Sequence, residues 1–62
     1  MSETTIIRKA TIVCEAARAM RADRQSSDRE RRVMLDVLAL DNARLATLYD
    51  AIQYAREAAF KS

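Results

Sequence analysis

The sequence predicts an all-α protein: a two-helix antiparallel hairpin with a longer second helix, which dimerises into a helical bundle. Three observations predict this fold. The 62 residues include no glycine and no proline, which argues against strands joined by tight turns. Apolar residues recur at heptad spacing in both halves of the chain, and a polar segment at residues 21–32 separates the halves. We expect one domain over residues 1–62, with helices at 3–24 and 28–60 joined by a turn at 23–27.

The first helix is predicted from apolar residues spaced alternately four and three apart. These are Ile6, Ala10, Val13, Ala17 and Met20. Ser2, Thr4 and Thr5 are each suitable N-caps, and Glu3 suits the positive end of the helix dipole. Because alanines alternate with larger residues, a neighbouring helix is expected to approach this face closely.

The start of the second helix is predicted at Ser27. The residues Ser27-Asp28-Arg29-Glu30 fit the S-x-x-E capping box, with two acidic residues in the first turn. The remaining connection has a normal length for antiparallel helices. One unbroken rod is an alternative, because both apolar faces share a heptad frame. The rod would place Arg24, Ser27 and Arg31 consecutively on the apolar face, so we favour the hairpin.

The second helix carries a heptad pattern for more than three repeats. Its positions are Met34, Leu38, Asp41, Leu45, Leu48, Ile52, Ala55 and Ala59. Asp41 is costly among apolar neighbours unless it is hydrogen-bonded or paired. It either caps a third helix that starts there, or it pairs with an arginine or specifies register within a continuous helix. Position 44 is Arg, so a capping box is absent, and we favour the continuous helix.

The apolar face of the second helix needs more cover than the first helix provides. A chain of this length buries only about 60% of its unfolded surface, and such chains often gain stability by oligomerising. We therefore expect a homodimer. The residues assigned to the core and dimer interface are Met34, Leu38, Leu45, Leu48 and Ile52.

All three aromatic residues lie in the last fourteen positions. In the hairpin, the second helix extends about 15 Å beyond the first at 1.5 Å per residue. An uncovered apolar patch of this kind marks an interaction surface, and tyrosine suits it because the ring is buried while the hydroxyl stays hydrated. The residues predicted to bind a partner are Tyr49, Ile52, Tyr54 and Phe60.

The turn of the hairpin is predicted to be a basic cap, although the formal net charge of the chain is only +2. The cap consists of Arg24, Arg29, Arg31 and Arg32. Arginine forks suit phosphates and carboxylates, but arginines also serve as soluble helix formers. Nucleic-acid binding is an alternative function, weakened because the aromatic residues lie at the other end.

The composition disfavours enzymes and metal proteins. There is no histidine and a single cysteine, Cys14, which leaves no internal disulfide and no plausible zinc set. Nucleophilic catalysis lacks its usual base, so we expect no enzyme activity and no cofactor. The N-terminus lacks a signal-peptide layout and no 18-residue apolar run occurs, so we expect a cytoplasmic protein without a membrane span.

The two-helix plan, with apolar faces at 6–20 and 34–59, resembles two groups of small proteins. One is the plasmid copy-number protein that binds paired RNA loops as a dimeric hairpin. The first helix here offers Arg8, Thr11, Glu15 and Arg18 on its outer face, which departs from the polar pattern of that family. The chain resembles more closely the small phage proteins that bind and inhibit host factors, including quorum-sensing anti-activators. That resemblance implies binding to a host protein such as a DNA-binding regulator; a purely structural oligomerisation module is the remaining alternative.

Overall fold

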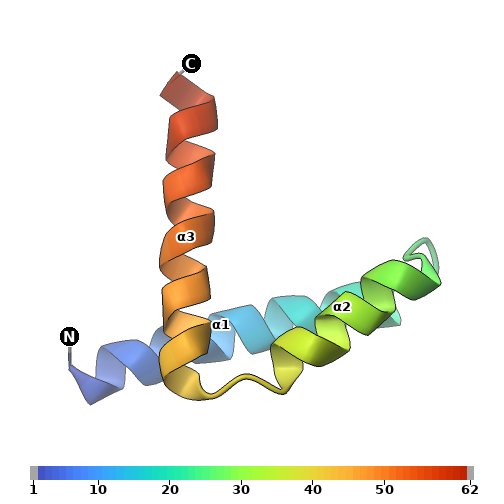
Figure 1. The fold of residues 1–62 in the computed structure, drawn as a ribbon, viewed down its shortest axis with the longest axis horizontal. Coiled ribbons are helices and arrows are strands. Elements are labelled where there is room, and N and C mark those ends of the chain that lie inside the picture. Colours follow the sequence, from blue (N-terminus) through green and yellow to red (C-terminus); the bar gives the residue numbers. More distant parts are fainter. Residues whose placement is uncertain (1, 62) are drawn as a thin grey trace.

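A computed structural model describes residues 2–61, which form three helices. They are α1 (Glu3–Ala22), α2 (Asp28–Leu38) and α3 (Asn42–Lys61). α1 and α2 run antiparallel, and α3 stands across them so that its C-terminal half projects from the pair (Figure 1). The all-α class is confirmed. The prediction of one continuous helix over 28–60 is wrong, because the chain ends α2 and starts α3 at a new angle.

The ends of α1 are held by side chains. The Ser2 Oγ accepts the backbone N–H of Thr5 at 3.3 Å, which makes Ser2 the N-cap among the three candidates. The helix ends at Ala22, two residues before the predicted boundary. In place of a glycine C-cap, the Arg31 guanidinium donates to the carbonyl oxygen of Asp23 at 3.2 Å. A side chain from α2 thus stabilises the turn that leads into it.

The predicted helix start at Ser27 is confirmed. The Ser27 Oγ accepts the backbone N–H of Glu30 at 3.1 Å, and the Ser27 hydroxyl lies 3.1 Å from the Glu30 Oε1. Asp28 and Glu30 occupy the first turn of α2, where negative charge is favourable. The Ser27 N-cap therefore sets this boundary where the sequence indicated it.

Asp41 is the N-cap of α3. Its Oδ1 accepts the backbone N–H of Arg44 at 2.8 Å, and its carbonyl accepts the N–H of Leu45 at 3.0 Å. Leu40 packs against the core cluster that contains Leu45. These two leucines flank the cap at the positions of a hydrophobic staple, which fixes the direction in which a chain enters a helix. The cap and the staple together turn α3 away from α2.

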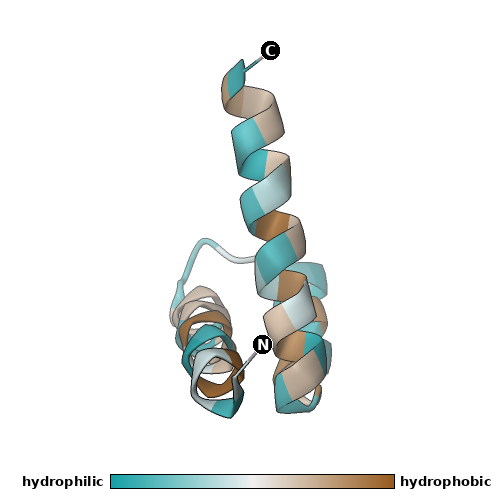
Figure 2. Cartoon of the chain, turned by 90° about the vertical axis from the view of Figure 1, so that its left-hand side faces the viewer, coloured by the Kyte–Doolittle hydropathy of each residue, from teal (hydrophilic) through white to brown (hydrophobic). Residues whose placement is uncertain are grey.

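The core is small and lies where α1 and α3 cross. Five residues of the described chain are buried hydrophobics: Ala10, Val13 and Ala17 from α1, with Leu45 and Ala46 from α3. α2 contributes only partly buried side chains, such as Val37. Hydrophobic residues continue along α3 above the two lower helices, outside this core (Figure 2). The fold therefore leaves much of its apolar surface uncovered.

Candidate interaction site

The five residues predicted for the core and dimer interface differ in how far each is buried. Leu45 is 2% exposed and lies at the centre of the core. Met34, Leu38 and Leu48 are half-buried, and Ile52 is 44% exposed. Within one chain, only Leu45 has the full cover that a core position requires. The other four present apolar surface that a second molecule is free to cover.

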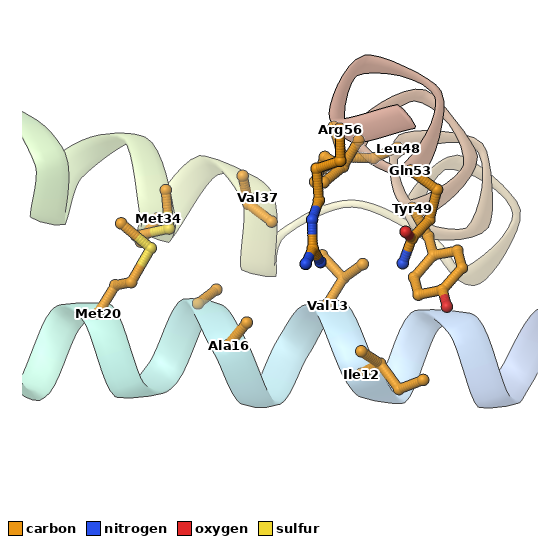
Figure 3. Close-up of a pocket in the computed structure, with 12 residues that line it drawn as sticks. Ile12, Val13, Ala16, Met20, Met34, Val37, Leu48, Tyr49, Gln53 and Arg56 are labelled. Carbon is orange, nitrogen blue, oxygen red and sulfur yellow. The ribbon is translucent and has the colours of Figure 1, made fainter. Parts of the chain in front are cut away.

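An open apolar groove runs along the inner corner between α3 and the α1–α2 pair; we call it the inner groove. Its volume is about 260 Å³, and its lining includes Ile12 and Met20 of α1, Met34 of α2 and Ile52 of α3. The side chains of Met20 and Met34 point toward each other across the two helices (Figure 3). Thioether chains of this kind adapt to irregular partners. Ile12 is not among the heptad-spaced residues from which the first helix was predicted, and periodicity alone does not bring it near Ile52.

The polar groups of the inner groove are few. Gln53 and Arg56 line it from α3, and Arg56 reaches toward α1 above Val13 (Figure 3). Small-molecule sites usually enclose roughly 300–1,000 Å³, and several of their polar groups point toward the ligand. The inner groove is smaller, open and almost wholly apolar, so it suits a protein side chain or helix rather than a metabolite.

The projecting end of α3, residues 52–61, is termed the α3 projection. Its two aromatic residues are highly exposed: Tyr54 by 76% and Phe60 by 93%. At 100° per residue, these two positions are separated by about 120° around the helix axis. Phe60 shares a surface depression with Arg56, which lines the inner groove, whereas Tyr54 shares another with Ala58. The Tyr54 and Phe60 side chains therefore leave the helix in different directions, although Glu57 and Lys61 line both depressions.

Tyr49, predicted to bind a partner, lies at the base of the α3 projection and is half-buried against the chain's own core. The ammonium group of Lys9 lies 5.7 Å from its ring centroid and 2.6 Å from the Asp50 Oδ1. These contacts join α1 to α3 beside the crossing point. Tyr49 therefore helps to hold the helix that presents the projection.

The four residues of the predicted basic cap lie around the connection between α1 and α2. Arg24, Arg29 and Arg32 are exposed. Arg31 is half-buried; besides its bond to the Asp23 carbonyl, its guanidinium lies 3.6 Å from the Asp28 carboxylate. Arg31 thus serves the turn itself, and the positive surface open to a ligand is smaller than the sequence indicated.

No protein-family model, curated protein or solved structure matches this chain. Within residues 2–61, no group of three or more metal-ligating side chains is positioned to hold an ion. None of the helices in the same range has the length and apolarity needed to cross a bilayer. Among the described residues, the exposed surfaces include the inner groove, the side of the α3 projection that carries Tyr54, and the exposed arginines.

Proposed function

We propose that this chain is a small, non-enzymatic protein–protein interaction module. It binds a cytoplasmic host regulatory protein, such as a transcription regulator, and modulates or inhibits it. The observation that carries the proposal is Tyr54, a large aromatic side chain left 76% exposed on the helix α3. Its neighbours on the same helix face, Ala51 and Ala58, are small and exposed. Small neighbours allow a partner to surround the tyrosine ring, as interface anchors require.

The experiment isolates partners by affinity purification from the native host, identifies them by mass spectrometry, and measures the affinity of the purified pair. Tyr54→Ala is expected to weaken binding by about 30-fold or more, since truncating an aromatic anchor costs roughly 2 kcal/mol or more. Tyr54→Phe is the matched control, because it keeps the ring and removes only the hydroxyl. Unchanged affinity in Tyr54→Ala would contradict the proposal.

A second candidate function, nucleic-acid binding, is supported by the exposed Arg24, Arg29 and Arg32 near the α1–α2 connection. Charge reversal at Arg29 and Arg32 distinguishes the two functions. For a protein partner it mainly slows association, whereas for nucleic acid it removes binding, and the affinity of the unmodified chain falls steeply with salt. A chain that binds neither class would be a structural oligomerisation module.

A further inference from the structure

We propose that a second copy of this chain occupies the inner groove, with the α3 projection of each copy seated in the groove of the other. This inference goes beyond the proposed function, since it concerns the protein alone and requires no knowledge of another partner. It assigns the two faces of the α3 projection to different tasks. The face with Ile52 and Phe60 pairs two copies, and the face with Tyr54 remains outside.

The first argument is surface area. A compact monomer of this mass, 7.0 kDa, exposes about 4,000 Å². This chain exposes 5134 Å², an excess of about 1,100 Å² over that scaling. A standard stable interface buries about 800 Å² on each partner. One symmetric contact of that size would cover most of the surface that the monomer leaves in excess.

The second argument is shape. The Cα radius of gyration is 12.6 Å, compared with about 10.6 Å for a compact domain of this length. The chain extends 35 × 32 × 14 Å, with the α1–α2 pair forming one arm and α3 the other (Figure 1). Such a molecule carries both a concave corner and a projecting rod. A two-fold axis places the rod of each copy in the corner of the other, as an isologous dimer requires.

The third argument is the chemistry of the two surfaces. The groove floor combines exposed apolar residues, Ile12 by 46% and Met20 by 42%, with the small Ala16, which permits close approach of a helix. The α3 projection offers Phe60, which is 93% exposed and shares a surface depression with Arg56, a residue that also lines the inner groove. The Arg56 side chain reaches toward α1 above Val13 (Figure 3), and its apolar stem adds to the groove wall. A formal net charge of +2 opposes self-association only weakly.

The test measures mass in solution by light scattering across micromolar concentrations, with helicity followed by circular dichroism. The unmodified chain is expected at twice its monomer mass of 7.0 kDa. Phe60→Lys is expected to give a monomer with unchanged helicity, because a side chain 93% exposed contributes nothing to the fold of one chain. Tyr54→Lys is the matched control on the opposite face and stays dimeric. A monomeric unmodified chain, a dimeric Phe60→Lys variant or a monomeric Tyr54→Lys variant would overturn the inference.

Cross-linking tests the geometry of the dimer. In a Cys14→Ser background, chains with Phe60→Cys are mixed with chains with Ile12→Cys and oxidised. The proposal expects a disulfide between the two kinds of chain, because Phe60 of one copy sits in the groove that Ile12 lines. Replacing Phe60→Cys with Tyr54→Cys should give little cross-link, and equal yields would refute this seating. Both measurements use the purified chain alone. The dimer proposal can therefore fail while partner binding through Tyr54 is upheld, and partner binding can fail while the dimer proposal is upheld.

Discussion

Replacing Leu45 with alanine is expected to remove much of the stability of this fold. Leu45 is 2% exposed and is the largest fully buried side chain among residues 2–61. Its burial is worth about 1.5–3 kcal/mol, and the cavity left behind raises the usual cost of Leu→Ala in a core to about 2–5 kcal/mol. At 0.05–0.15 kcal/mol per residue, a chain of this length has only about 3–9 kcal/mol of total stability. One substitution therefore removes a large share of it.

Thermal unfolding followed by circular dichroism measures this effect at one fixed protein concentration. Leu45→Ala should lower the melting temperature by at least about 8 °C, since 1 kcal/mol corresponds to about 4–8 °C in a domain of this size. Leu35→Ala, the same chemical change at an α2 position 49% exposed, is the control and should lower it much less. Equal shifts in both variants would refute the assignment of the core to the α1–α3 crossing.

The remaining predictions concern polar contacts. Asp41→Ala should destabilise the fold by about 0.5–2 kcal/mol, while Asp41→Asn should restore most of the loss because asparagine also caps helices; equal losses in urea unfolding would contradict the cap. Ser27→Ala should cost a similar amount without changing partner affinity, and an unchanged melting temperature would refute its role. A double-mutant cycle between Lys9 and Asp50, whose charged atoms are 2.6 Å apart but partly exposed, should give a coupling of about 0.2–1 kcal/mol. The coupling should decrease with added salt, and a salt-independent value would be evidence against a direct ion pair.

Two helix starts were predicted from local capping residues, whereas the third was considered and not favoured because the heptad pattern runs through it. Ser27 was found through its capping box. The break at Asp41 was considered but not favoured, because the heptad spacing continues through it and position 44 holds arginine instead of the Glu or Gln of a capping box. A cap needs only a backbone N–H, which Arg44 supplies. The signal available in the sequence was the pair Leu40 and Leu45 flanking Asp41 as a hydrophobic staple.

The candidate site could be predicted only in part, because its shape depends on the helix break at Asp41. That Tyr54 and Phe60 belong to a helical segment followed from periodicity, and the structure leaves both exposed. Their separation onto two faces also follows from 3.6 residues per turn. The inner groove did not follow, because it exists only when α3 crosses α1 and brings Ile52 above Ile12. Crossing direction is set by the connection between helices, which sequence periodicity does not report.

The small core also has a calorimetric consequence. The heat-capacity change of unfolding grows with the apolar area newly exposed to water, and denaturant sensitivity grows with the total area exposed. Here the core consists of three alanines, one valine and one leucine, so both quantities should be low for the isolated chain. The stability of the monomer then varies little with temperature and its unfolding is gradual. Covering the inner groove would increase both the heat-capacity change and the denaturant sensitivity. Binding would therefore appear in a calorimeter as a sharper unfolding transition with a higher melting temperature.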